Sequence, residues 1–277
     1  MANTALVWIR DDFRIQNNDA LTYASNKHDI VTAVFIFNSN IFDHKREAQK
    51  WWVSKSLENF KSDLKKLNIG LEIIKDDEIN FFSKIKSNSK ISVYWNKVYE
   101  PTELEKDKKS GTNITKKNID FKFFKGNVLN EYNKITKNDG TPFKVYSPFW
   151  RNAEQFYLER LPDKISKVKK CKKINTLFKN QIKSEDILPR SDWYKKFEKY
   201  WVPSEQKAHE NLDNFVNKSI LNYGVDRDFP SIKGTSLLSP YIRNGQINVG
   251  DIWEKCKKLK SNNVSVKKYT NEIGWRE

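Results

Sequence analysis

The residues with the clearest chemical potential in this 277-residue chain lie between positions 222 and 248. Within them, residues 234–239 read Gly-Thr-Ser-Leu-Leu-Ser and supply three hydroxyls and several free backbone amides, directly before Pro240. Proline suits the first turn of a helix, and amides at a helix N-terminus favour an anion such as a phosphate or pyrophosphate. The pattern predicts a phosphate-binding turn, although a capped helix followed by a turn would have the same sequence.

Three side chains near this turn suit the same ligand chemistry. Arg227 and Arg243 are two of only nine arginines in the chain, and the planar guanidinium matches a phosphate better than a lysine ammonium does. Tyr223 has a ring that can stack on an aromatic ligand and a hydroxyl that can hydrogen-bond to it. The two arginines thus suit a phosphate, and the tyrosine suits an aromatic ligand.

The sequence contains no conventional catalytic set. It has no G-x-S-x-G and no H-E-x-x-H motif, so hydrolase chemistry has little support. Its two cysteines and three histidines are scattered without the spacing of metal ligands, at Cys171, Cys256, His28, His44 and His209. We therefore expect neither a metal site nor a residue that acts as a catalytic acid or base, and we expect a cofactor to supply the chemistry.

The first 130 residues must position these groups, and they alternate between two patterns. Apolar runs predict strands at 5–9, 30–37, 71–74, 91–95 and 121–124. Helical spacing predicts a long helix at 52–67, terminated by Gly70, and shorter helices at 79–85 and 103–109. Strands that alternate with helices indicate βαβ units, and hence an α/β fold with a doubly wound, Rossmann-like parallel sheet.

The loop after the first strand lacks the motifs by which such folds commonly bind nucleotides. It contains Arg10, Asp11, Asp12 and Arg14 in place of G-x-G-x-x-G or a P-loop, which disfavours standard NAD and Walker-type phosphate binding. The simplest prediction for these four charged residues is a solvated turn in which they pair with one another.

The second half of the chain differs in composition and in its apolar pattern. Turn residues at 138–142 precede an aromatic-rich segment at 143–150, which Pro148 interrupts, and residues 164–190 are basic and linker-like. Helical spacing returns at 205–219 and 250–259. The predicted organisation is an α/β domain at 1–130, an extended linker at 131–200 and the beginning of an all-helical domain at 201–277.

The charge of the chain indicates a polyanionic partner. Its 51 Lys and Arg exceed its 35 Asp and Glu, a net charge of +16, of which +5 falls in residues 1–130 and +11 in residues 131–277. A basic excess in one half suits nucleic acid, although richness in Lys, Asn and Ile is also what an A/T-rich genome encodes. No apolar run spans a membrane and no secretory signal is visible, so we predict a cytoplasmic protein without a membrane partner.

Four segments resemble the DNA photolyase/cryptochrome family. The strongest resemblance is to the family's flavin-binding stretch, which this sequence matches in register at Tyr223, Arg227-Asp228, Pro230, Gly234-Thr235-Ser236, Leu238-Ser239-Pro240-Tyr241, Arg243 and Gly245. Residues 6–14, 94–103 and 142–150 are similar to three further motifs of the family, in the same order. These matches span nearly the whole chain, and we identify it as a suspected family member.

The resemblance implies roles for individual residues. The residues that would hold FAD are Tyr223, Thr235, Ser236, Leu237, Leu238, Ser239 and Tyr269. Thr102 and Glu103 stand where folate-type members contact a methenyltetrahydrofolate-type antenna. Residues 271–277 resemble the family's N-E-L-I-W-R-E helix, in which Gly274 departs from the usual apolar residue. The residues that would contact DNA or its lesion are Arg227, Glu272, Trp275 and Arg276.

The implied function is that of a deoxyribodipyrimidine photo-lyase. Such an enzyme uses light to transfer an electron from reduced FAD to a cyclobutane pyrimidine dimer in DNA, and the basic face around the pocket would hold the phosphates. The alternatives are a cryptochrome-type photosensor and a flavin-free remnant that binds nucleic acid or an antenna. Family members continue past W-R-E, so we expect a monomeric N-terminal portion that is inactive alone and binds FAD weakly or not at all.

Overall fold

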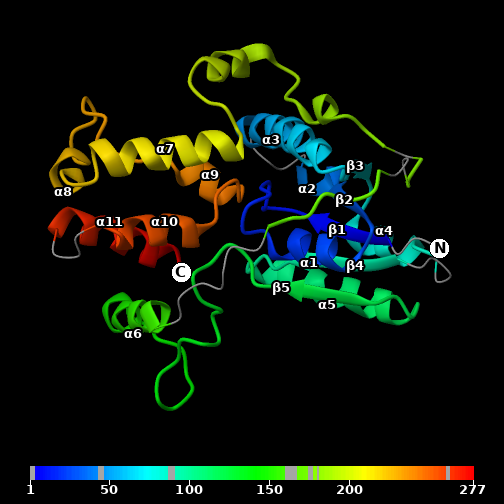
Figure 1. Cartoon of the computed structure of the whole chain (residues 1–277), viewed down its shortest axis with the longest axis horizontal. Helices are drawn as coiled ribbons and strands as arrows, with labels where there is room; N and C mark the ends of the chain where they lie inside the picture. The colour runs from blue at the N-terminus through cyan, green and yellow to red at the C-terminus, as the bar shows by residue number, and fades with distance from the viewer. Residues whose placement is uncertain are drawn as a thin grey trace.

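The computed structural model describes residues 4–42, 47–86, 91–159, 167–173, 177–179, 181–259 and 263–277. A parallel sheet with helices on both faces forms one side of the molecule, and a group of helices lies beside it (Figure 1). None of the helices in these ranges is long and apolar enough to cross a membrane. His44, one of the three histidines considered above, lies outside the described residues.

Five parallel strands form a single sheet in the order β3-β2-β1-β4-β5, which confirms the predicted α/β fold. The strands are β1 (Thr4–Ile9), β2 (Ile30–Phe37), β3 (Gly70–Lys75), β4 (Ile91–Asn96) and β5 (Phe121–Phe124). Two of them have the predicted bounds, and the other three exceed the predicted ranges by one or two residues. Strand β1 lies in the middle and is buried from its second residue onward, because helices cover both faces of the sheet.

Helices cover both faces of this sheet, as a doubly wound fold requires. They are α1 (Asp19–Lys27), α2 (Ser39–Phe42), α3 (Glu47–Lys66), α4 (Glu78–Lys84) and α5 (Pro101–Thr115). On one face Leu57 of α3 belongs to the same apolar core as Val7 of β1. On the other face Phe82 of α4 packs edge-on against Trp8 of β1, with ring centroids 5.0 Å apart. Successive residues of β1 therefore serve two separate cores.

The end of helix α3 differs from the prediction. Gly70 does not terminate the helix, because it is the first residue of β3. Asn68 takes the left-handed conformation instead, with φ of 58°. Its N–H donates to Lys65 O (3.1 Å), and the N–H of Ile69 donates to Leu64 O (3.1 Å), which is the pairing of a Schellman cap. Asparagine tolerates this conformation, so a glycine is not needed there.

Helices dominate the described residues after β5, apart from an isolated antiparallel bridge between Ile74 and Gln181. They are α6 (Tyr146–Glu159), the 3₁₀ helices η1 (Ser184–Ile187) and η2 (Asp192–Lys199), α7 (Glu205–Lys218), α8 (Tyr223–Asp226), α9 (Ser239–Arg243), α10 (Val249–Lys257) and α11 (Val264–Arg276). Helices α7 and α10 correspond to the helices predicted at 205–219 and 250–259. Phe215 of α7, Trp253 of α10 and Ile273 of α11 belong to one apolar cluster that these helices share.

The basic segment predicted at 164–190 lies against the sheet domain wherever it is described. The N–H of Cys171 donates to Leu67 O (2.9 Å), at the end of α3. The buried carboxylate of Glu72, on β3, accepts from the N–H of Leu177 (2.7 Å). The lysines of residues 167–173 remain exposed on the surface of the sheet domain.

Helix α6 begins inside the aromatic segment that was expected to be broken by Pro148. It starts at Tyr146, so Pro148 lies in its first turn. Proline is tolerated there because the first turn of a helix has no acceptor for its backbone N–H. Tyr146, Phe149 and Trp150 therefore project from a helix, whereas Phe143 precedes it.

Helix α6 packs closely on α11 through an unusual pair of residues. The indole of Trp150, which is 5% exposed, lies against the backbone of Gly274. A Cβ atom at position 274 would lie 2.5 Å from Cδ2 of this indole. The Trp150 Nε1–H also donates to Asn271 Oδ1 (3.0 Å), one turn earlier on α11. The departure from the family pattern at Gly274 is thus explained by the close approach of the two helices.

We expect Gly274→Ala to destabilise the chain, although alanine is the better helix former by about 1 kcal/mol. Displacing a packed indole costs about 1–3 kcal/mol, which the gain in helix propensity offsets in part, so the free energy of unfolding should fall by about 1 kcal/mol, and by no more than about 2 kcal/mol, in a urea titration. Gly111→Ala is the matched control, because it also lies within a helix and its Cβ would approach the nearest atom, on Phe121, only to 3.3 Å. Equal or greater stability of Gly274→Ala would contradict the packing.

Candidate functional site

The loop that follows β1 is held against the backbone of the helical part. Gly245, after α9, has φ of 63°, and a Cβ atom there would lie 1.9 Å from Asp11 O. The N–H of Phe13 donates to Asn244 O (3.4 Å), and Arg14 Nη1 donates to Gly245 O (2.9 Å). Only glycine fits this position, because it needs both the left-handed conformation and the space of a missing side chain.

The far end of the same loop is fastened by a side chain from α7. The carboxylate of Glu205, the first residue of α7, accepts from the N–H groups of Ile15 (2.7 Å) and Gln16 (2.8 Å). Burial raises the pKa of Glu205, and these two hydrogen bonds oppose that rise. Nearby, the indole N–H of Trp52 donates to Oε1 of Gln246, which is fully buried (2.9 Å). The two halves of the molecule therefore meet through satisfied, buried polar groups.

The charged residues of this loop are not the solvated turn that was expected. Arg14 is 2% exposed and Asp12 is 5% exposed. The Asp12 carboxylate accepts from Asn96 Nδ2 (2.7 Å) at the end of β4 and from the N–H of Arg10 (2.9 Å). Burial raises the pKa of Asp12, while Arg14, these hydrogen bonds and Arg10 oppose the rise. The prediction is wrong because it did not foresee that the helical part covers this loop.

A cavity of about 1070 Å³ lies where the two halves meet. Its sheet side is formed by Asp11 and by residues 97–101, which follow the carboxyl end of β4. Its helical side is formed by Trp201, Tyr223, Thr235, Ser236, Leu237, Ser239, Pro240, Ile242, Arg243, Tyr269, Glu272, Ile273 and Arg276, and residues 127–128 complete the lining. Segments that are more than 170 residues apart in the sequence thus share one cavity.

Most of the residues expected to hold FAD line this cavity. Thr235, Ser236 and Ser239 supply hydroxyls, and Leu237 has φ of 53°, a conformation that non-glycine residues rarely adopt and that is often found at ligand sites. Leu238 is the exception, because it is 1% exposed and belongs to the apolar cluster of the helices. Helix α9 has only five residues, so the loop before it is the main source of free backbone amides.

Two tyrosines expected to contact FAD form one aromatic wall. The rings of Tyr223 and Tyr269 meet edge-on with centroids 5.1 Å apart, and Phe215 packs on both of them. Burial raises the pKa of Tyr269, against a hydrogen bond with Ser236 that lowers it. The hydroxyl of Tyr269 therefore keeps its proton at neutral pH, and it connects α11 to the loop before α9.

Two of the residues expected to contact DNA are paired with each other. Arg227 Nη1 and Glu272 Oε1 are 2.5 Å apart, and both side chains are partly exposed. Glu272 lines the cavity together with Arg276, whose pKa burial lowers while Glu277 opposes this. Trp275 lies outside the lining, is 65% exposed and stacks on Tyr146. The structure thus brings Arg227, Glu272 and Arg276 to one side of the cavity, with Trp275 near them on α11.

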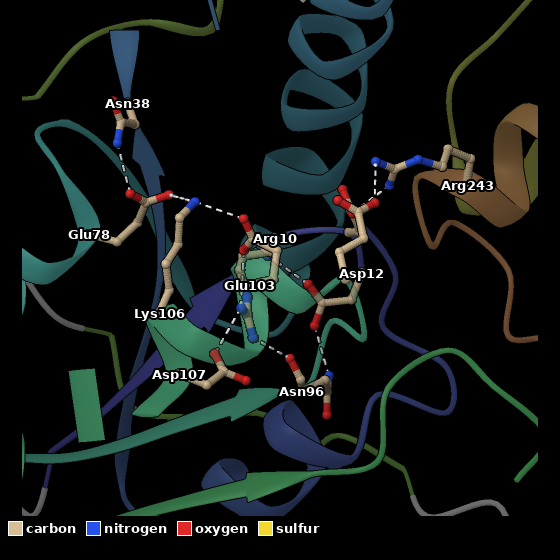
Figure 2. Close-up of polar contacts among 11 residues, drawn as sticks. Arg10, Asp12, Asn38, Glu78, Asn96, Glu103, Lys106, Asp107 and Arg243 are labelled. Carbon is tan, nitrogen blue, oxygen red and sulfur yellow. Dashed lines mark hydrogen bonds and ion pairs between the residues drawn. The ribbon is translucent and has the colours of Figure 1, made fainter. Parts of the chain in front are cut away.

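The expected antenna residues lie beside the cavity without lining it. Figure 2 shows the carboxylate of Glu103 between Arg10 (3.3 Å) and Lys106 (2.7 Å). Burial would raise the pKa of Glu103, but Lys106 and then Arg10 hold it below its ordinary value. Thr102 is exposed, and its neighbours at 100 and 101 form part of the cavity wall. Both carboxylate oxygens of Glu103 are therefore already engaged by protein cations.

The charges of the lining are balanced. Three basic residues, Lys97, Arg243 and Arg276, face three acidic ones, Asp11, Glu100 and Glu272. Arg243 forms ion pairs with both Asp11 and Glu100. The basic excess of the second half of the chain therefore does not lie in the cavity lining itself. Within the described residues, no group of three His, Cys, Asp or Glu side chains lies close enough together to hold a metal ion.

Trp201 and Lys97 line the cavity, although the sequence reasoning had not singled them out as site residues. Lys97 follows β4 directly, and ligands of doubly wound sheets bind at the carboxyl ends of strands, so the rule for such folds was a usable signal. Trp201 had no such signal, because its helical spacing from Trp193 and Phe197 indicates an apolar face after η2 and says nothing of a ligand.

We expect Gly245→Ala to weaken the contact between the two halves severely. Two costs add up, about 1–2 kcal/mol for a left-handed alanine and about 1–3 kcal/mol for displacing the backbone at Asp11. Gly140→Ala measures the first cost alone, since Gly140 has φ of 78° but the new Cβ would have no atom within 4 Å. Urea titrations should give a loss of about 1–2 kcal/mol for Gly140→Ala and at least about 1 kcal/mol more for Gly245→Ala. Equal losses would contradict the close contact.

Comparison with known proteins finds photolyases and cryptochromes. A family model described as DNA photolyase matches residues 5–167. The deoxyribodipyrimidine photo-lyase of Agrobacterium fabrum is 31% identical over 278 residues, which cover 98% of this chain and 57% of that protein. Cryptochrome-1 of Arabidopsis thaliana is 24% identical and matches 99% of this chain and 42% of its own length. The chain therefore spans about half the length of these curated relatives.

A solved structure agrees with the sequence comparison. The crystal structure of a bacterial class III photolyase from Agrobacterium tumefaciens is similar with a TM-score of 0.87 at 29% identity, and the similarity covers 100% of this chain and 58% of that one. The similarity includes the helices as well as the sheet domain, so the arrangement of both halves is shared. With the family match over more than half of its residues, the chain belongs to the DNA photolyase family.

Proposed function

We propose that the cavity between the sheet and the helices is a flavin site, and that its side near Glu272 and Arg276 receives a pyrimidine dimer from DNA. The activity would be the light-driven repair that the name deoxyribodipyrimidine photo-lyase describes. The observation that carries the proposal is the composition of one cavity, which combines the loop at 235–239, the tyrosines at 223 and 269, and the charged side chains of α11.

The lining is suited to FAD in size and chemistry. A volume of about 1070 Å³ lies slightly above the range of about 300–1,000 Å³ typical of small-molecule sites, as a large cofactor needs. Thr235, Ser236 and Ser239 offer hydroxyls to phosphates and ribose, and Tyr223 offers an aromatic surface. Arg276 adds a positive charge to the lining. These residues would hold the cofactor, which when bound supplies the light-driven electron transfer.

The remaining residues of the site would bind and orient DNA. Glu272 has the acceptor oxygens to take a hydrogen bond from the imide N–H of a thymine, and its ion pair with Arg227 holds the carboxylate in place. Trp275 offers an exposed ring on which a base can stack. A dimer leaves the duplex at low cost, because the damaged bases are already poorly stacked and paired. The chain's own contribution is therefore recognition and the exclusion of water from the cavity.

Cryptochrome-type light sensing is the alternative function, because the relatives that match nearly the whole chain include Cryptochrome-1 of Arabidopsis thaliana. A sensor needs the cofactor cavity but has no need to prefer damaged DNA. A flavin-free protein that binds nucleic acid would likewise show no preference for a lesion. The three functions therefore differ in the ratio of affinities for damaged and intact DNA.

Fluorescence anisotropy with a labelled single-stranded oligonucleotide tests the proposal. We expect the oligonucleotide with one thymine dimer to bind at least about tenfold more tightly than the intact one at the same salt concentration, since the dimer adds stacking and hydrogen bonds. Glu272→Gln should reduce this preference to less than about threefold, because the acceptor loses its charge.

Glu210→Gln is the matched control for this experiment, because Glu210 is an exposed, paired glutamate of α7 that lies outside the cavity. It should retain the full preference. Equal affinity of the unmodified chain for damaged and intact DNA would rule out lesion recognition and would favour one of the two alternatives.

A further inference from the structure

Tyr146, the first residue of α6, makes the closest ring contact of Trp275. The two rings lie nearly parallel, with an interplanar angle of 6° and centroids 3.8 Å apart. The hydroxyl of Tyr146 donates to Asn271 O (2.8 Å), on the preceding turn of α11. The tyrosine is thus fixed to α11 at two points, by its ring and by its hydroxyl.

A second ring of α6, the indole of Trp150, lies next to Tyr146. The indole of Trp150 lies parallel to Tyr146, at 10° and with centroids 6.5 Å apart, and it donates to the side chain of Asn271 (3.0 Å). Trp150 can lie there because position 274 is a glycine. Tyr146, Trp150 and Trp275 therefore form a short aromatic column, which α6 supplies to α11 and whose buried end is Trp150.

This column fixes the orientation of an otherwise exposed indole. Trp275 is 65% exposed, and a side chain with so little burial ordinarily moves among several rotamers. The stack covers one face of its ring, so the other face is available to a flat ligand. Glu272 lies three residues earlier on the same helix, and its charge contributes, after burial, to raising the pKa of Tyr146 to about 12. The indole, the tyrosine and the Glu272 carboxylate are thus neighbours.

We propose that Tyr146 is a positioning residue that holds the Trp275 ring as a stacking platform for an unpaired base or a pyrimidine dimer. The inference rests on the proposed function and extends it to a residue outside the cavity lining. An indole that is already oriented loses less conformational freedom when a base stacks on it, and the affinity is correspondingly higher. Tyr146 acts only through Trp275, so its effect on DNA binding must vanish when Trp275 is absent.

The experiment combines ¹⁹F NMR of the full chain, labelled with 5-fluorotryptophan, with anisotropy of the dimer-containing oligonucleotide. Trp275→Phe assigns the Trp275 resonance among the nine tryptophans. Tyr146→Leu should shift and narrow this resonance, because the ring loses its neighbour and moves freely, whereas Tyr146→Phe should leave it nearly in place. Tyr132→Leu is the control, since Tyr132 is 67% exposed and packs edge-on against Tyr99 instead of Trp275.

The anisotropy measurements use the same variants and compare their affinities for the dimer-containing oligonucleotide. Trp275→Ala should weaken binding about tenfold or more, as loss of a stacking ring does. Tyr146→Leu should weaken it about three- to tenfold, and Tyr146→Phe and Tyr132→Leu less than about twofold. Tyr146→Leu added to Trp275→Ala should cause no further loss, since a positioning residue has nothing left to position, whereas a merely structural role would give additive losses. Tyr146→Met replaces Tyr146→Leu if the latter does not fold.

Each outcome separates the two proposals. If Trp275→Ala binds as tightly as the unmodified chain, the proposed lesion contact fails, and the role of Tyr146 in binding fails with it. If Trp275→Ala weakens binding while Tyr146→Leu does not, or if the two losses are additive, only the positioning role is overturned. A Trp275 resonance that Tyr146→Leu leaves unchanged would also overturn it.

Discussion

The close contact between Gly245 and the carbonyl of Asp11 is the constraint on which the rest of the molecule depends. It presses the loop after β1 against the end of α9, and it places Arg243 within reach of Asp11. Glu205 and Arg14 fasten the same loop from the helical and the sheet side. The cavity has one wall on each half of the molecule, so its shape is set by this contact. A loop that is usually devoted to nucleotide phosphates is used here for docking two halves.

Polar and aromatic groups have different roles in this arrangement. Polar and charged groups in and beside the cavity are largely paired with one another, as in Arg243 with Asp11 and Arg227 with Glu272, so the cavity has little unbalanced charge. The proposed attraction for DNA would then come from lysines outside the lining, which long-range electrostatics allows. Aromatic rings, in contrast, remain available at the edge of the cavity and on α11, where Trp275 is held by Tyr146.

Sequence reasoning predicted the elements that depend on local patterns. Apolar runs located all five strands, and the resemblance to the family located residues 223–243, whose hydroxyls and tyrosine line the cavity. It failed where the decisive partner is distant in the chain. Asp12 and Arg14 were expected in solvent because the helices that cover them follow some 190 residues later. The close packing of Trp150 on Gly274 was likewise invisible, since periodicity compares only residues a few positions apart.

Hydrogen–deuterium exchange of the full chain with millimolar FAD tests the central claim, that the cavity between the halves is the cofactor site. Millimolar ligand detects binding even when it is weak. Slower exchange of backbone amides is expected on both walls, in peptides that cover residues 97–101 and 234–243, because these segments line the cavity. Unchanged exchange in both segments, or protection only in the lysine-rich residues 167–173, would contradict the claim.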